Sequence, residues 1–190
     1  MHLGAPLCPG CASALPWASA GDGRRDGPLV RTDVPLTLAG PARDLVHALK
    51  FRDAPAVADL MAAHIVHAVP GALADSRAVL VPVPAHPARR RRRGYDHADV
   101  LARALARRTG HEVVCALARA GGLRARQRGT GRAGRLSGEA LTIGARGPAP
   151  ARCVLVDDVR TTGATLRACA VALHDGGARR VGAVAYAQAP

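Results

Sequence analysis

Two adjacent acidic residues follow a short apolar run in the last quarter of the sequence. Asp157 and Asp158 come directly after residues 154–156 (VLV). Neighbouring carboxylates repel each other, so the pair is best explained by a ligand that uses both. A cis-diol that donates two hydrogen bonds would do so, and so would a metal-bound sugar phosphate. The acid pair therefore predicts a binding site for a ligand of this kind.

The residues after the acid pair are of the types that bind phosphate. Residues 161–165 read TTGAT, which offers hydroxyl groups and a glycine that permits close approach of the backbone. A helix is expected to begin here, and its free amide groups and positive dipole end favour an anion. The alternative is that a threonine only caps the helix and the aspartates are solvated. The two features together, between an apolar strand and an amphipathic helix, favour the ligand site.

The elements that must position this segment alternate between strands and helices. Buried strands are predicted over residues 78–83, 112–117, 154–156 and 181–186. Helices are predicted over residues 42–51, around residues 57–65, ahead of Gly110 and over residues 165–174. Residues 120–135 are rich in glycine and arginine without apolar periodicity, which predicts a long mobile loop. The alternation predicts an α/β fold with a doubly wound, mostly parallel sheet.

The segment VLVDDVRTTGAT resembles the phosphoribosyl pyrophosphate motif of type I phosphoribosyltransferases. The resemblance implies that fold, and it implies catalytic roles for the two acids, which would hold the ribose 2′ and 3′ hydroxyls. The following loop would cradle the 5′-phosphate. The binding residues implied are Asp157, Asp158, Val159, Arg160, Thr161, Thr162, Gly163, Ala164 and Thr165. Arg160 replaces the aliphatic residue usual at that point, and its guanidinium could itself assist anion binding.

Two further segments narrow the resemblance to the ComF (competence protein F) family. Residues 81–106 contain VPVP and RGYD, similar to that family's pattern before a helix, and residues 38–51 (LAGPARDLVHALKF) are similar to its segment before the core, including Lys50. The resemblance implies that Arg93 and Gly94 belong to a loop facing the pyrophosphate, for which the planar fork of arginine is well suited. The other four arginines of the run at residues 89–93 are assigned to solvent or nucleic acid.

A flexible loop is also implied by the ComF resemblance. Gln127 and Arg135 fall at the spacings of that loop, although Gly138 stands where the family usually has asparagine. Closure of this loop over the ligand would exclude water from the reaction.

Outside these segments, His97 lies beside an aspartate at a predicted helix start and is the histidine of interest.

The first forty residues differ in composition from the rest and contain a cysteine pair. Residues 1–40 predict a small N-terminal lobe, and residues 41–190 the α/β domain. Cys8 and Cys11 form a CxxC knuckle, which is half of a tetrahedral zinc site. The ComF resemblance implies a second such pair, but residues 1–40 contain no other cysteine, and His2 is the only imidazole nearby. A degenerate zinc finger is therefore the favoured interpretation, with bound zinc as the alternative.

The formal net charge of +13 suits a phosphorylated ligand or a polyanion such as nucleic acid. Twenty-seven basic residues include a single lysine, Lys50, so a compositional bias toward arginine explains the charge equally well. The few aromatic side chains are scattered, and any contact to nucleic acid would therefore be to backbone phosphates. The sequence has neither a long apolar stretch nor a basic start followed by one, which predicts a cytoplasmic protein without membrane insertion.

Two functions remain open at this point. One is a phosphoribosyltransferase, in which a nitrogenous nucleophile displaces Mg²⁺-bound pyrophosphate from C1 of the ribose. The other, implied by the ComF resemblance, is an accessory factor for DNA uptake in natural transformation that senses the sugar phosphate. Single-stranded DNA or the uptake machinery would be its partner. Neither the acceptor base nor the oligomeric state follows from the sequence.

Overall fold

The structure of the protein is a computed structural model, which describes residues 7–18, 23–51, 54–88, 91, 94–119 and 142–190. Its centre is a six-stranded sheet in the order β1-β2-β8-β7-β4, with β3 also paired to β8. These strands are β1 (Arg24–Asp26), β2 (Leu29–Asp33), β3 (Leu36–Thr37), β4 (Val79–Pro82), β7 (Arg152–Arg160) and β8 (Arg180–Gln188). The pairing is parallel except between β1 and β2. The predicted α/β class with a mostly parallel sheet is confirmed.

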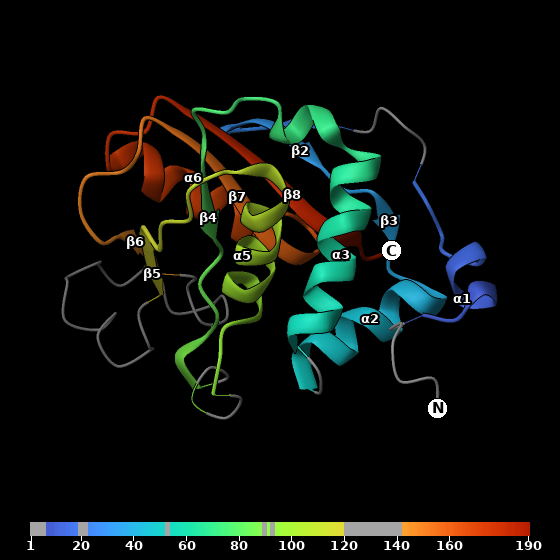
Figure 1. Cartoon of the computed structure of the whole chain (residues 1–190). Helices are drawn as coiled ribbons and strands as arrows, with labels where there is room; N and C mark the ends of the chain where they lie inside the picture. Colours follow the sequence, from blue (N-terminus) through green and yellow to red (C-terminus); the bar gives the residue numbers. More distant parts are fainter. Residues whose placement is uncertain (1–6, 19–22, 52–53, 89–90, 92–93, 120–141) are drawn as a thin grey trace.

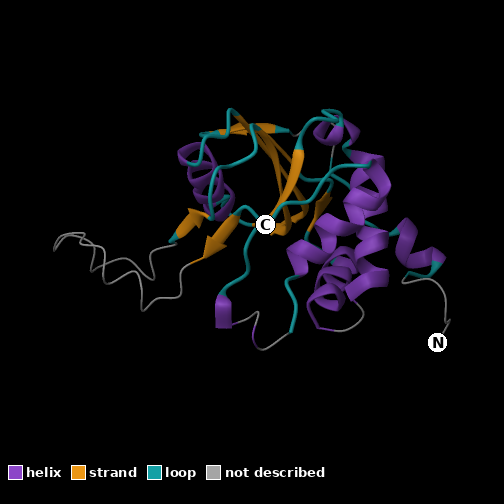
Figure 2. Cartoon of the chain, turned by 60° about the vertical axis from the view of Figure 1, so that its left-hand side comes forward, coloured by secondary structure: helices purple, strands orange, loops and turns teal. Residues whose placement is uncertain are grey.

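Helices cover both faces of the sheet. α2 (Gly40–Phe51), α3 (Ala54–Ala68) and α5 (His97–Thr109) lie on one face, and α6 (Ala164–Asp175) lies on the other (Figures 1 and 2). The remaining described elements are α1 (Pro9–Ser13), a 3₁₀ turn (Pro70–Leu73) and a hairpin of β5 (Leu117–Arg119) and β6 (Ile143–Ala145). Within the described part of the chain, no helix is both long and apolar enough to cross a membrane.

β7 shows why the central strands are apolar on both sides. Side chains alternate between the faces of a strand, so neighbouring residues enter different cores. Val154 and Val156 pack with α2, α3 and α5, whereas Cys153 and Leu155 pack with α6. Because both faces are covered by helices, a continuous apolar run is required, and the sequence signal for this strand is strong.

Both ends of α5 are set by residues that favour helix termini. Asp96 is the N-cap, and its carboxylate accepts a hydrogen bond from the Ala98 amide at 3.2 Å. The same carboxylate accepts one from the Ala85 amide at 3.0 Å, which ties the loop after β4 to the start of the helix. Gly110 ends the helix with φ of 75°, a left-handed conformation that suits glycine. This capping places His97, the first residue of α5, at the edge of the sheet.

The predicted strand over residues 112–117 is wrong in its extent. The segment meets β4 only in an isolated parallel bridge between Val113 and Leu80. The Ala116 amide then donates to the carbonyl of Val114 at 2.9 Å, which turns the backbone away from the ladder. Leu117 begins β5, which pairs with β6 in a separate two-stranded sheet. An apolar run alone does not distinguish a strand of the main sheet from a segment that leaves it.

The predicted N-terminal lobe shares its sheet with the rest of the chain. β2 and β3 both lie within residues 1–40, and both pair with β8. Trp17 bridges to Leu36 and contacts the His64 ring of α3 edge-on, with 5.4 Å between ring centroids. His64 in turn lies 3.0 Å from the hydroxyl of the buried Tyr186. The division of the chain at residue 40 stays a prediction.

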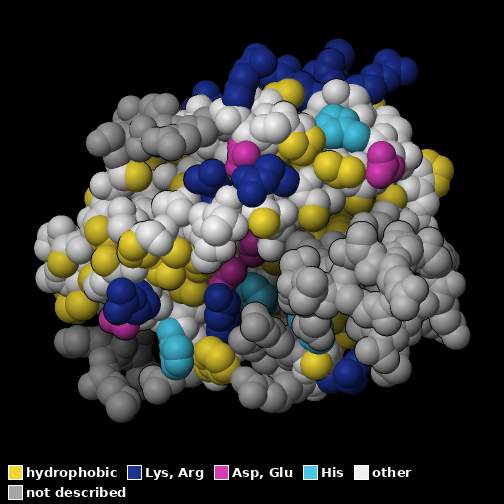
Figure 3. All heavy atoms as spheres, turned by 180° about the vertical axis from the view of Figure 1, so that it is seen from behind, with side chains coloured by type: hydrophobic (Ala, Val, Ile, Leu, Met, Phe, Trp, Pro, Cys, Tyr) yellow, Lys and Arg dark blue, Asp and Glu magenta, His cyan; other side chains and the backbone are white. Residues whose placement is uncertain are grey.

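Arginine side chains gather at the edge of the sheet where its parallel strands begin. Figure 3 shows Lys and Arg side chains along the upper rim of the molecule. We call five exposed arginines at the start of β4, β7 and β8 and on β2 the arginine edge: Arg31, Arg77, Arg152, Arg179 and Arg180. Two of them form ion pairs, Arg31 with Asp33 at 2.6 Å and Arg152 with Asp75 at 2.9 Å. The described residues provide no ion pair for the other three.

Candidate functional site

β7 carries the acid pair to the carboxyl edge of the sheet, where ligands of open α/β sheets bind. The strand was expected to end at Val156, but it continues to Arg160. β8 supplies backbone partners along this extension, from Asp157 opposite Ala185 to Arg160 opposite Gln188. The expected end of the strand is therefore wrong, and both carboxylates project from within β7 rather than from a loop after it.

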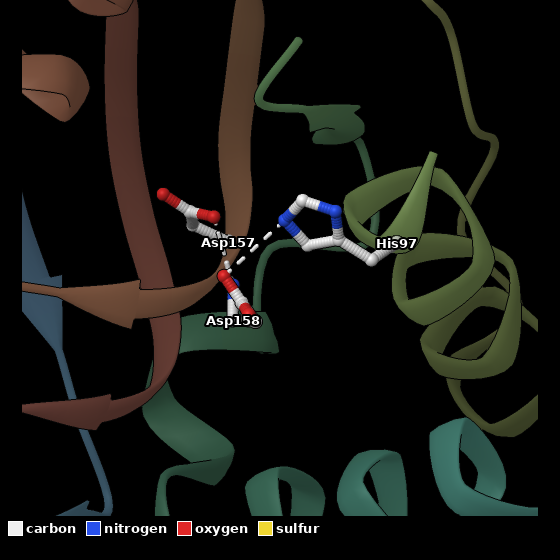
Figure 4. Close-up of side chains that lie close together, drawn as sticks. All are labelled: His97, Asp157 and Asp158. Carbon is white, nitrogen blue, oxygen red and sulfur yellow. Dashed lines mark hydrogen bonds and ion pairs between the residues drawn. The ribbon is translucent and has the colours of Figure 1, made fainter. Parts of the chain in front are cut away.

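Asp158 is buried and has two basic neighbours from other elements. Its Oδ2 lies 2.6 Å from Nζ of Lys50, at the end of α2. Its Oδ1 lies 3.4 Å from Nε2 of His97, at the start of α5. Figure 4 shows the His97 ring turned toward the acid pair. Three elements distant in sequence therefore meet at one carboxylate.

The two acids of the pair have different environments. Burial raises the pKa of Asp157, and the negative charge of Asp158 raises it further. Burial also acts to raise the pKa of Asp158, but the hydrogen bond and charge of His97 and the charge of Lys50 outweigh it and hold that pKa well below the usual range. Among the described residues, none forms a salt bridge with Asp157, whose Oδ1 accepts a hydrogen bond from the Asp158 amide at 2.9 Å. Asp158 is thus the ionised, fixed member of the pair.

The predicted anion loop lies between β7 and α6. Gly163 is the N-cap of α6, with φ of 77°, and it has no side chain to bond the first amides of the helix. The Thr162 hydroxyl accepts only a long hydrogen bond, 3.4 Å, from the Ala164 amide. The structure therefore confirms a helix start directly after the loop, with little side-chain capping of its first amides. Phosphate binding by this loop stays a prediction.

Arg160 is engaged in a cluster behind the loop. Its Nη1 donates to Oε1 of Gln188 at 2.9 Å, and its Nη2 donates to Asp26 at 3.3 Å. Arg167 donates to both carboxylate oxygens of Asp26, at 2.9 and 3.0 Å, and to the Thr162 carbonyl at 3.1 Å. The described contacts therefore give Arg160 a role in holding the loop to β1 and β8.

The acid pair and the loop share one cavity of about 260 Å³. Of the predicted binding residues, those that line it are Asp157, Asp158, Val159, Thr161 and Thr165. Lys50, His97 and Arg119 line it as well. The cavity therefore combines carboxylates, threonine hydroxyls and basic side chains at the edge of the sheet.

A second cavity, of about 910 Å³, adjoins the first. Pro84, Ala85 and Arg119 line both. Gly94 of the predicted pyrophosphate loop lines the larger one, together with Arg91. Arg93, Gln127 and Arg135 lie outside the described residues. The sequence does not single out Arg119, because it adjoins the arginine-rich loop and looks like one of its many arginines. Its place between the two cavities follows from the pairing of β5 with β6.

Two groups of residues bear on metal binding. The ligand atoms of His97, Asp157 and Asp158 all lie within 4.8 Å of one another, close enough to share an ion. Cys8 and Cys11 belong to no group of three or more potential ligands within the described ranges. The Cys11 amide donates to Sγ of Cys8 at 3.4 Å, and such hydrogen bonds lower the pKa of the Cys8 thiol. Zinc at this pair stays a prediction.

Comparison with known proteins gave limited similarity. No protein-family model matches the chain, and no curated protein matches it. A solved structure described as the allosteric regulatory enzyme of purine biosynthesis is similar, with a TM-score of 0.43 and 19% identity. The match covers 74% of this chain but only 30% of that one. The fold class therefore rests on the strand order and helix placement described above.

Proposed function

We propose that the chain binds phosphoribosyl pyrophosphate with Mg²⁺ and transfers the phosphoribosyl group to a nitrogenous acceptor, with release of pyrophosphate. The observation that carries this proposal is the single cavity lined by the acid pair, the loop threonines and the cation Arg119, with Lys50 held against Asp158. Such a ligand needs acceptors for its hydroxyls, donors for its 5′-phosphate and cations for its pyrophosphate. The resemblance of residues 154–165 to the type I phosphoribosyltransferase motif, and of longer segments to the ComF family, supports the same assignment.

The proposed reaction needs position and charge rather than a covalent protein nucleophile. The bond from C1 to the pyrophosphate oxygen breaks, its electron pair leaves with pyrophosphate, and the acceptor nitrogen bonds to C1 and loses a proton to solvent. Positive charge develops on the ribose as the bond breaks. The acid pair would accept hydrogen bonds from the ribose hydroxyls and face that charge, and Arg119, between the two cavities, would hold the leaving group.

The residues present fit a magnesium-bound ligand. Carboxylate oxygens suit Mg²⁺, which usually keeps several waters and binds through one or two carboxylates plus substrate phosphates. Lys50 already holds one oxygen of Asp158. Asp157 is therefore the residue best placed to meet the metal-bound ligand. When bound, Mg²⁺ would neutralise charge on the pyrophosphate.

Calorimetric titration with phosphoribosyl pyrophosphate and Mg²⁺ tests the proposal. We expect the wild type to bind and the Asp157→Asn/Asp158→Asn variant to lose at least about 100-fold in affinity, since each substitution replaces a carboxyl oxygen by an amide nitrogen that cannot accept a hydrogen bond. Asp44→Asn/Asp175→Asn changes the charge equally at two exposed aspartates and serves as the control. Equal affinity in all three proteins, or no binding by the wild type, would remove the proposal. Circular dichroism should confirm that each variant is folded.

A second measurement separates an enzyme from a sensor. With binding established, pyrophosphate release is measured with a panel of nucleobases and other nitrogenous acceptors. Turnover with one of them supports the transferase. Binding without turnover on any of them favours the accessory factor for DNA uptake.

The arginine edge is the observation that favours this second candidate function. It lies at the end of the strands opposite to the acid pair, so a polyanion bound there would leave the cavity open. Arg77, Arg179 and Arg180 form no salt bridge with the described residues. The amides of Arg179 and Arg180 both donate to the Ala151 carbonyl, at 2.9 and 3.1 Å, so neighbouring loops hold the backbone of these arginines in place. Exposed guanidinium groups on such a backbone suit the phosphates of DNA.

Salt dependence of binding to a single-stranded oligonucleotide tests this surface. Replacing Arg77, Arg179 and Arg180 by glutamine should reduce the slope of log K against log salt by about 0.7 for each arginine that binds a phosphate. The control replaces Arg25, Arg43 and Arg108, three exposed arginines spread over β1, α2 and α5, with the same change in charge. If both triple variants lose the same affinity, net charge alone drives binding and the arginine edge is not a DNA site.

A further inference from the structure

Asp158 is held from two sides by side chains that the sequence motif does not contain. Only 5% of its side chain is exposed, and the side chains of Lys50 and His97 are 25% and 12% exposed. A buried carboxylate is costly unless it is paired and hydrogen-bonded. Lys50 at 2.6 Å and His97 at 3.4 Å contact different oxygens, so together they fix both the position and the rotation of the carboxylate.

Asp157 has no comparable support. It is half-buried, and its carboxylate accepts a hydrogen bond only from the neighbouring amide of Asp158 within the described part of the chain. Both acids line the 260 Å³ cavity. The pair is thus unequal: each oxygen of Asp158 already lies against a basic side chain, whereas the described residues place no such side chain against Asp157.

We propose that Lys50 is a positioning residue which, with His97, fixes Asp158, and that Asp157 is the member of the pair that makes the decisive contact to the ligand. This inference rests on the proposed function, because it assigns unequal roles within the acid pair of that site. Lys50 lies more than one hundred residues before the motif, at the last turn of α2. Because Lys50 acts through Asp158, the packing of α2 influences where the Asp158 carboxylate lies at the carboxyl end of β7.

The different roles of Lys50, Asp157 and Asp158 are tested by measuring the affinity of variants for phosphoribosyl pyrophosphate with Mg²⁺. We expect Asp157→Asn to lose at least about 100-fold, and Lys50→Met and Asp158→Asn each to lose about tenfold, as expected for an indirect effect of a charge-assisted contact. The double variant Lys50→Met/Asp158→Asn should bind no more weakly than either single variant, because both changes break the same contact. Lys50→Arg, which keeps the charge, should recover most of the affinity.

A matched control is the ion pair of Arg107 with Asp59, which has the same distance of 2.6 Å but joins the exposed surfaces of α5 and α3. Arg107→Met should leave affinity unchanged. The inference is overturned if Lys50→Met binds like the wild type, if its loss multiplies with that of Asp158→Asn, or if Asp158→Asn is as damaging as Asp157→Asn. Absence of binding by the wild type would instead remove the proposed function, and the inference with it.

Discussion

Replacing Gly163 by alanine is expected to lower both the stability of the protein and its affinity for phosphoribosyl pyrophosphate. With φ of 77°, this residue adopts a left-handed conformation that costs a residue with a Cβ about 1–2 kcal/mol. An added Cβ would also lie 2.9 Å from Oδ2 of Asp26 and 3.2 Å from the guanidinium atoms of Arg160 and Arg167. The cluster behind the loop would have to shift. We expect a loss of about 2–4 kcal/mol in the free energy of unfolding, measured by urea denaturation, and an affinity loss of at least about tenfold.

Gly110 provides the control for backbone strain. Its φ of 75° nearly equals that of Gly163, but a Cβ built on it meets nothing within 4 Å. Gly110→Ala should therefore cost only the strain, about 1–2 kcal/mol, without changing ligand affinity. The difference between the two variants isolates the contact with the Asp26 cluster. Equal losses of stability at both positions, or unchanged affinity in Gly163→Ala, would contradict this account of the loop.

The strands and the loop around the acid pair could be predicted because their signals are local. An apolar run buried on both faces, a following acid pair and a glycine at a helix start are all contained in residues 153–165. The α/β class followed from the alternation of such runs with amphipathic segments. The segment over residues 112–117 has a similar apolar character, yet it leaves the sheet after one bridge. Pairing partners rather than composition decide that outcome.

The surroundings of the acid pair could not be predicted in the same way. Lys50 lies in a family-like segment and His97 lies beside an aspartate, but nothing in their spacing shows that both contact Asp158. The contacts exist because α2 and α5 pack on the same face of the sheet. The sequence gives Arg160 a role in anion binding. In the structure its guanidinium forms an ion pair with Asp26, which lies nearby because β1 pairs with β2. Contacts of this kind are properties of the packed chain.

Asp26→Asn is expected to destabilise the protein, because Asp26 is the shared partner of two arginines. Its side chain is 17% exposed, and it accepts hydrogen bonds from Arg160 and from Arg167. Asparagine keeps the size but loses the charge, and it leaves the guanidinium groups with one acceptor oxygen. The expected loss in the free energy of unfolding at pH 7 is about 1–3 kcal/mol, the usual range for hydrogen bonds to charged groups.

The pH dependence of that loss identifies the carboxylate as its source. Burial acts to raise the pKa of Asp26, but the hydrogen bonds and charges of Arg167 and Arg160 outweigh it, and the folded pKa lies below the ordinary value. The stabilisation is therefore complete above the unfolded pKa of about 3.9 and disappears as pH falls through the folded value. The gap between wild type and Asp26→Asn should shrink as the pH falls below about 4.

Asp59→Asn is the matched control for the Asp26 prediction. It breaks the ion pair with Arg107, in which both side chains are about half exposed, so water screens the interaction. Such surface pairs contribute about 0–1 kcal/mol. If Asp26→Asn costs no more than Asp59→Asn, the two arginines are adequately solvated without Asp26, and the cluster does not hold the loop. If it costs more, and the excess fades in acid, a single carboxylate on β1 supports the loop at the start of α6.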